Sequence, residues 1–198
     1  MIGSKKLTMK YMRFALAVGL GLLLLTSCIK SGTGTGLPEA TQKGANTFGF
    51  LLNDNVWIPK GSVSGASRLF MEYDPTLDGI GYLRISAYNL KDTETFKGNS
   101  YFDLYVSPID GLGMYEADPS DGFPGAQYTN IIANESMCAY RNGVIDGFVN
   151  ITKLDTEARI ISGNFEFTLT ATDCYPEEQN CPACEDIKIT DGRFDMSY

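Results

Sequence analysis

The sequence of 198 residues contains no histidine. Histidine is the commonest general base and metal ligand in proteins, and it activates the nucleophile of Ser-His and Cys-His pairs. Its absence excludes those sites, although catalysis by paired carboxylates remains open. Positive charge is also scarce, with 16 lysines and arginines against 24 acidic residues. Because such a balance repels phosphate backbones, nucleic acid is not expected as a partner.

Long apolar runs are missing too. The run from Phe14 to Leu25 has 12 residues, fewer than the roughly 20 that a membrane-spanning helix needs. Basic residues precede it, and Thr26-Ser27-Cys28 closes it. This order is typical of a bacterial lipoprotein signal peptide. We predict cleavage before Cys28 and attachment of palmitate-type chains to Cys28, which anchors the protein in the membrane.

The alternative is an ordinary secretory signal, but Thr26-Ser27 is a poor match to the Ala-x-Ala-like site that such signals use. Position 29 is Ile rather than Asp, so the usual inner-membrane retention signal is missing. The expected location is therefore the outer membrane of the cell envelope. No acidic cluster follows Cys28, so the periplasmic face and the cell surface both stay open.

Three regions follow from this interpretation. Residues 1–27 are the cleaved signal, 28–47 the lipidated cysteine with a flexible tether rich in Gly and Thr, and 48–198 a globular domain. The cleaved part carries four positive charges and no negative ones, so cleavage changes the formal net charge from −8 to −12. The remaining length is ordinary for one domain with a sizeable core.

The globular region lacks a helical hydrophobic period and contains short β-rich runs broken by Gly, Asn and Asp. Residues 48–52 and 56–59 flank Asn53-Asp54-Asn55, which predicts a hairpin. Alternating runs at 82–89, 101–106 and 160–171 predict half-buried strands, with further strands at 67–73, 113–117, 128–133, 137–141, 149–154 and 187–198. The predicted fold is all-β: one antiparallel sandwich or barrel-like meander.

Four cysteines follow Cys28: Cys138, Cys174, Cys181 and Cys184. An even number in an exported chain indicates disulfides, and three connectivities are possible. One of them joins Cys174 to Cys184 and Cys138 to Cys181. One alternative is a zinc site, but zinc usually takes two CxxC-like pairs and only one is present. The other is a Cys181/Cys184 redox pair, but these residues lie in a loop rather than at the start of a helix. No metal or cofactor is expected.

Two stretches carry a family resemblance. The first runs from Leu37 to Gly49 and continues in Val56-Trp57-Ile58-Pro59; the second is 161–168 with 189–195. Together they resemble a domain-of-unknown-function family of Bacteroidetes-type lipoproteins. The resemblance implies an exported, β-rich lipoprotein and no catalytic residues. Members often have a cysteine where this sequence has Phe50, so a disulfide from that position is absent here.

The candidate ligand-binding residues are Trp57, Tyr82, Arg84 and Tyr88, because aromatic rings beside charged groups bind sugar rings or protein partners. Tyr101, Tyr105, Tyr115 and Tyr128 complete the aromatic set, and Tyr101 and Tyr105 are expected to share a strand side with Asp103. Tyrosine also commonly covers the solvent side of strands without binding anything.

Two acidic loops, 74–79 and 118–122, suggest either calcium sites or ordinary Asx turns, and turns need no further ligands.

The preferred function is a non-catalytic envelope protein that binds a glycan or another envelope protein. One alternative is an enzyme acting on glycans with a carboxylate pair such as Asp103 and Glu166. The other is a structural subunit of a surface assembly.

Overall fold

The computed structural model describes residues 36–61, 67–76, 80–91, 97–120, 122–133, 136–175 and 184–198, without the side chains of residues 132, 133, 136 and 175. Within these residues the chain forms twelve strands and no helix. The described part accordingly holds no helix that is long and apolar enough to cross a membrane. Cys28 and the apolar run before it lie outside the described residues.

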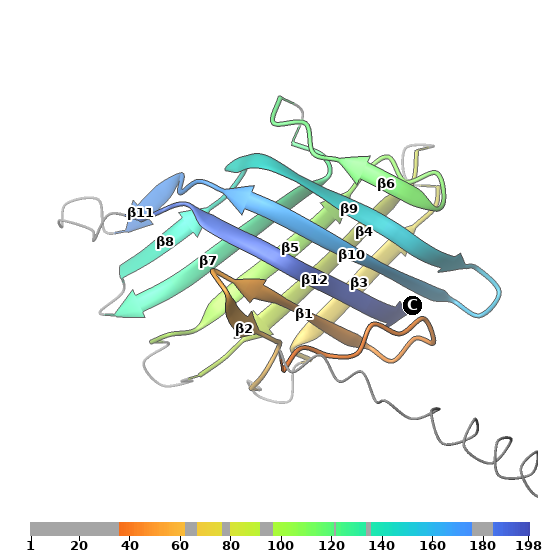
Figure 1. Cartoon of the computed structure of the whole chain (residues 1–198), viewed down its shortest axis with the longest axis horizontal. Coiled ribbons are helices and arrows are strands. Elements are labelled where there is room, and N and C mark those ends of the chain that lie inside the picture. The colour runs from red at the N-terminus through yellow and green to blue at the C-terminus, as the bar shows by residue number, and fades with distance from the viewer. Residues whose placement is uncertain are drawn as a thin grey trace, which may run out of the picture. The chain divides into compact units, whose positions relative to one another are not determined.

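The strands form two antiparallel sheets of six (Figure 1). Sheet A has the order β2 (Asn55–Trp57), β1 (Thr47–Leu52), β12 (Ile187–Ser197), β10 (Ile160–Leu169), β9 (Val144–Asp155) and β6 (Gly113–Glu116). Sheet B has the order β11 (Asp173–Tyr175), β8 (Ser136–Tyr140), β7 (Gly125–Ala133), β5 (Ser100–Val106), β4 (Tyr82–Asn89) and β3 (Leu69–Asp74).

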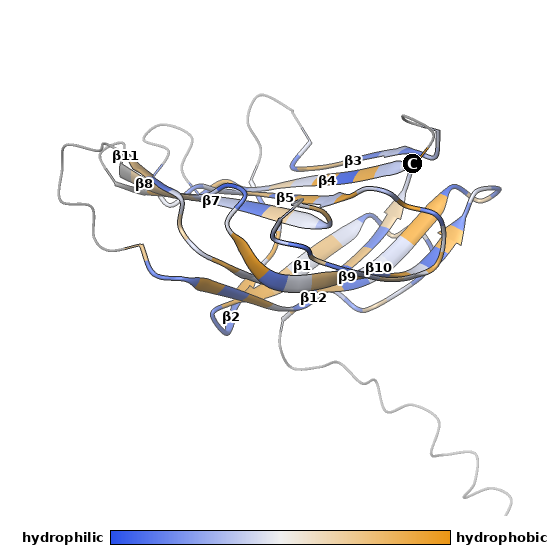
Figure 2. Cartoon of the chain, turned by 90° about the horizontal axis from the view of Figure 1, so that it is seen from above, coloured by the Kyte–Doolittle hydropathy of each residue, from blue (hydrophilic) through white to orange (hydrophobic). Residues whose placement is uncertain are grey.

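The two sheets lie face to face as separate layers (Figure 2). Phe165 of sheet A stacks on Phe102 of sheet B with ring centroids 5.7 Å apart. Phe48 and Phe50 add two more fully buried rings from β1. The all-β prediction is therefore confirmed as an open sandwich, and the barrel alternative is not observed.

Most strands begin and end close to the predicted positions. The hairpin at Asn53-Asp54 is confirmed, with φ values of 46° and 63° at the two turn residues. The last strand is irregular near Asp191, where its pairing shifts against both neighbours. One orientation was wrong. Simple alternation puts Lys153 on the same side as Val149 and Ile151, but a register shift near Thr152 turns Leu154 toward the core instead. Strand β11 was not predicted.

Two glycines make room for core rings in sheet A. A Cβ built on Gly192 would lie 2.6 Å from the ring of Phe165, and one on Gly163 would lie 2.6 Å from the ring of Phe194. Real side-chain contacts are never that short, so glycine is required for the close packing of these two rings.

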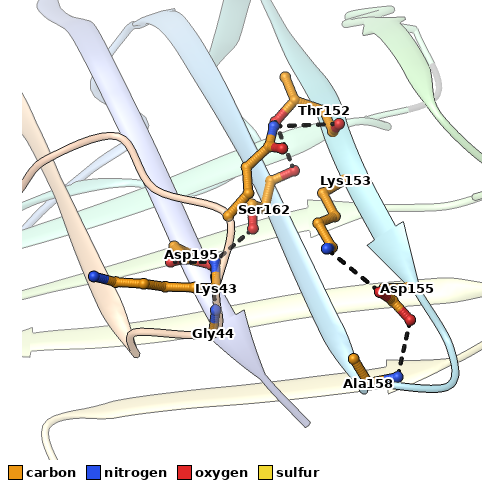
Figure 3. A network of polar contacts seen from close by, with 9 residues as sticks. Lys43, Gly44, Thr152, Lys153, Asp155, Ala158, Ser162 and Asp195 are labelled. Carbon is orange, nitrogen blue, oxygen red and sulfur yellow. Dashed lines mark hydrogen bonds and ion pairs between the residues drawn. The ribbon is translucent and has the colours of Figure 1, made fainter.

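The flexible tether predicted up to residue 47 is too long. Leu37 is buried, and residues 41–46 are fixed against β12. The carboxylate of Asp195, 1 % exposed, accepts hydrogen bonds from the hydroxyls of Thr41 (2.5 Å) and Ser162 (2.8 Å). It also accepts hydrogen bonds from the backbone N–H groups of residues 43, 44 and 45. Figure 3 shows Asp195 with Ser162, Lys43 and Gly44. We call residues 37–46 the strap; the sequence could not reveal it because its partner lies about 150 positions away.

One disulfide joins Cys138 of β8 to Cys184, at a Cα separation of 5.9 Å. This pairing overturns the Cys174–Cys184 connectivity, and it removes two of the four thiols from any zinc site. Cys184 is bonded to Cys138 rather than to Cys181, so the redox-pair alternative is also wrong. Cys174 is disulfide-bonded as well. Cys181 lies outside the described residues.

Candidate functional site

The outer face of sheet B, which points away from the core, gathers the tyrosines of β4 and β5. In β5, Phe102, Leu104 and Val106 are buried, so Tyr101, Asp103 and Tyr105 project outward. In β4, Leu83, Ile85 and Ala87 take the core side. The outward side chains of β4 are therefore Tyr82, Arg84, Ser86 and Tyr88. Strict alternation of buried and outward residues places all of these groups on one surface.

A polar network lies at the centre of this face. The Arg84 guanidinium contacts the Asp103 carboxylate at 3.0 Å, and the Ser86 hydroxyl donates a short hydrogen bond to the same oxygen. The guanidinium also lies 5.4 Å from the ring centre of Tyr105, within range of a cation–π interaction. Partial burial opposes the charge of Arg84, but the hydrogen bond and charge of Asp103 outweigh it and raise its pKa. Arg84 therefore keeps its charge, and the contact with Asp103 holds its guanidinium in place.

An aromatic cluster adjoins the network. Tyr88 meets Tyr101 edge-on at 5.4 Å and Phe70 of β3 edge-on at 6.0 Å. Edge-to-face contacts of this kind fix ring orientations and leave part of each ring open to solvent. Burial raises the pKa of Tyr101 above its ordinary value, so its hydroxyl remains neutral at physiological pH. Neutral hydroxyls both donate and accept hydrogen bonds.

These groups line an open hollow of about 490 Å³. Arg84, Tyr88, Tyr101, Asp103 and Tyr105 form one wall of it. Gln127 and Thr129 of β7 and Met137 of β8 are among the residues of the opposite wall. The hollow therefore combines aromatic faces, an ion pair and an uncharged amide, which suits a ligand carrying both apolar surfaces and hydroxyl groups.

Three of the four residues selected from the sequence lie on this face: Tyr82, Arg84 and Tyr88. Tyr82 lies on this face but does not line the hollow. Trp57 was assigned wrongly to the site. It is 4 % exposed in the core, where its ring stacks on Phe50 at 4.7 Å. Tyr128 was assigned wrongly as well, because it is 5 % exposed and packs in the core. The sequence of one short strand does not indicate which of its two sides faces the core, so it gave no basis for placing Trp57.

Sequence reasoning missed the contributions of β3, β7 and β8. Phe70 and Glu72 alternate with core-packed Leu69 and Met71, so the pattern that could have identified them was present. Gln127 and Thr129 could be placed only by knowing that β7 pairs with β5. That pairing is a long-range choice which local periodicity does not encode.

The enzyme alternative based on Asp103 and Glu166 does not fit. Glu166 lies between core residues Phe165 and Phe167, so it projects from the outer face of sheet A. Asp103 projects from the outer face of sheet B. Packed sheets are about 10 Å apart, so carboxyls on opposite outer faces exceed the spacing of roughly 5–9.5 Å that glycoside hydrolysis requires.

The acidic loops form Asx turns as far as the structure describes them. The Asp74 carboxylate accepts hydrogen bonds from the N–H and hydroxyl of Thr76, both at 2.8 Å. The Asp118 carboxylate accepts one from the N–H of Ser120 at 2.8 Å. Hydrogen bonding by the hydroxyl and then the N–H of Ser120 lowers the pKa of Asp118. Positions 77–79 and 121 lie outside the described residues. No group of three or more His, Cys, Asp or Glu side chains converges within the described part.

No protein-family model, curated protein or solved structure matches the chain.

Proposed function

We propose that the protein is a lipid-anchored, non-catalytic binding protein of the outer membrane, which holds a partner on the outer face of sheet B. The observation that supports binding is the convergence of Arg84, Asp103, Tyr88, Tyr101 and Tyr105 around one open hollow. The partner classes that this chemistry fits are a glycan and another envelope protein. Both use aromatic surfaces together with oriented hydrogen-bonding groups.

The anchor part of the proposal rests on the sequence around Cys28 and on the motifs that resemble the Bacteroidetes-type lipoprotein family. It is tested by growing cells with a clickable palmitate analogue. The full chain should take up label and fractionate with outer membranes, and Cys28→Ser should lose both properties. Label retained in Cys28→Ser would refute lipidation at this residue. Protease digestion of intact and lysed cells then assigns the leaflet.

The binding part is tested by site-specific crosslinking in intact cells. A photoreactive phenylalanine derivative replaces Tyr88 in one variant and Met114, which is 58 % exposed on sheet A, in the matched control. Irradiation should give adducts from position 88 and not from position 114. Sensitivity of the adducts to glycosidase or to protease identifies the partner class. Equal adduct yields at both positions would refute a binding role for sheet B.

A further inference from the structure

The hollow on sheet B does not stand alone. It shares Arg84 and Tyr88 with a hollow of about 310 Å³ that Phe70 and Glu72 also line. It shares Tyr105 and Gln127 with a third hollow of about 490 Å³, beside the segment that contains Phe123. The three hollows are neighbours that share lining residues, and we call them together the trough.

The trough is long compared with a single sugar ring or side chain. Its walls draw on β3, β4, β5, β7 and β8, five neighbouring strands of sheet B. Strands are spaced by about 4.8 Å, so the first two hollows together extend roughly 19 Å across the sheet. A depression of this length accommodates several units of a polymer laid across the strands.

Aromatic rings occur in all three sections of the trough. Phe70 is 47 % exposed in the first, Tyr101 and Tyr105 are half-buried in the second, and Phe123 is 40 % exposed in the third. Apolar side chains exposed to this extent are available for contact without unfolding anything. Rings distributed along a trough suit a ligand that repeats a flat, partly apolar unit.

The charges of the trough cancel. Arg84 and Arg141 are its positive side chains, and Glu72 and Asp103 its negative ones. A charged polymer therefore gains no net attraction from the walls, and the surplus of acid in the whole chain repels polyanions. The remaining polar groups, such as Gln127 and Asn142, donate and accept hydrogen bonds as hydroxyl-rich ligands require.

We propose that the trough binds an extended, uncharged polysaccharide and contacts several sugar units at once. This inference rests on the proposed function, because it names the ligand of the same face. A protein partner would instead favour a compact central contact with closely packed anchors, not rings spread over three connected sections.

The test uses the full-length lipidated chain in detergent. Affinity gels contain starch, xylan or galactomannan as polymers from outside the cell, or the uncharged capsular polysaccharide of the expressing cells as the internal source. Retention in one set and not the other identifies the source. The polymer that retains the chain is then supplied as oligosaccharides of two to eight units, and binding is measured by calorimetry. Affinity should rise at least tenfold between two and six units.

Substitutions at the ends of the trough test whether long oligosaccharides contact more of the site than short ones do. Phe70→Ala and Phe123→Ala, at opposite ends, should abolish the gain from long oligosaccharides and leave the affinity for short ones within twofold. Met114→Ala on sheet A is the control and should change nothing. Both end residues are partly exposed, and circular dichroism checks that each variant folds.

Two outcomes would overturn the inference. The first is an affinity that does not depend on oligosaccharide length but is lost in Tyr88→Ala. The face would then bind a short ligand, so the proposed function would stand and the polymer would be rejected. Retention by none of the gels would reject an uncharged polysaccharide. Crosslinking at position 88 would then show separately whether the face binds a protein.

Discussion

Replacing Asp195 by Asn should release the strap and destabilise the whole domain. One carboxylate oxygen accepts hydrogen bonds from Thr41 and from two strap N–H groups; the other accepts them from Gly44 and Ser162. An amide retains one acceptor oxygen and places an NH₂ group at the other position. The Gly44 N–H, at 2.8 Å, would then face a donor instead of an acceptor.

The expected loss follows from these contacts. A buried donor left without an acceptor costs about 1–3 kcal/mol, and hydrogen bonds to a charged group are worth about 1.5–3 kcal/mol against about 1 for neutral ones. Movement of the strap into water recovers part of the cost. We therefore expect Asp195→Asn to lower the free energy of unfolding by about 3 kcal/mol.

Two measurements check this. Urea denaturation gives the free energy of unfolding, and brief trypsin treatment reports cleavage after Lys43, which the strap protects while it is fixed. The control is Asp191→Asn on the same strand, where the side chain is exposed and should matter by less than about 0.5 kcal/mol. A loss below about 1 kcal/mol, with unchanged cleavage at Lys43, would refute the strap's dependence on Asp195.

The same carboxylate should make stability depend on acid. Burial opposes its charge, but the hydrogen bonds from Thr41, Ser162 and the strap outweigh burial and hold the pKa of Asp195 well below its ordinary value. Its contribution is therefore complete above about pH 3.9, where an unfolded aspartate ionises, and declines as pH falls below that. Asp195→Asn should lose this part of the acid dependence.

Three further changes have defined outcomes. Gly192→Ala would push a methyl group into the ring of Phe165 and should cost about 1–3 kcal/mol in urea denaturation; an unchanged midpoint would contradict the packing. Replacing Cys138 and Cys184 together by Ser opens a link of 46 residues and should cost up to about 4 kcal/mol, seen as a lower melting temperature; equal melting would count against the bond. Burial raises the pKa of Tyr128 to about 12. Stability should thus fall between pH 10 and 12, and Tyr128→Phe should remove that loss; a persisting loss would assign it to other tyrosines.

Local patterning predicted the strands that are buried on one side only. The runs at 82–89 and 101–106 alternate strictly, which fixed both their extent and the side taken by Arg84 and Asp103. The choice between sandwich and barrel depends on pairings such as β1 with β12, which no local pattern specifies.

The errors arose where a residue's environment is made by distant parts of the chain. Trp57 was placed in the binding site because its side chain was assumed to be exposed. In the structure its ring stacks on Phe50, and its indole N–H donates a hydrogen bond of 2.9 Å to the Ser100 hydroxyl, so the side chain is held in the core. The strap was taken for a tether because the segment 29–36, which directly precedes it, is rich in Gly and Thr. Its stabilising carboxylate, Asp195, reads locally as an ordinary polar residue between two core positions.

The neighbouring positions of β1 and β12 also determine the order of folding. Thr47 pairs with Asp195, and the Thr41 hydroxyl bonds to a carboxylate 154 positions further along the chain. Closing such a long loop is slow, because its entropy is lost before any contact compensates for it. Sheet A cannot be completed until the last residues of the chain are available. Until then, β1 can pair with β2 in its hairpin but lacks its other neighbour, β12.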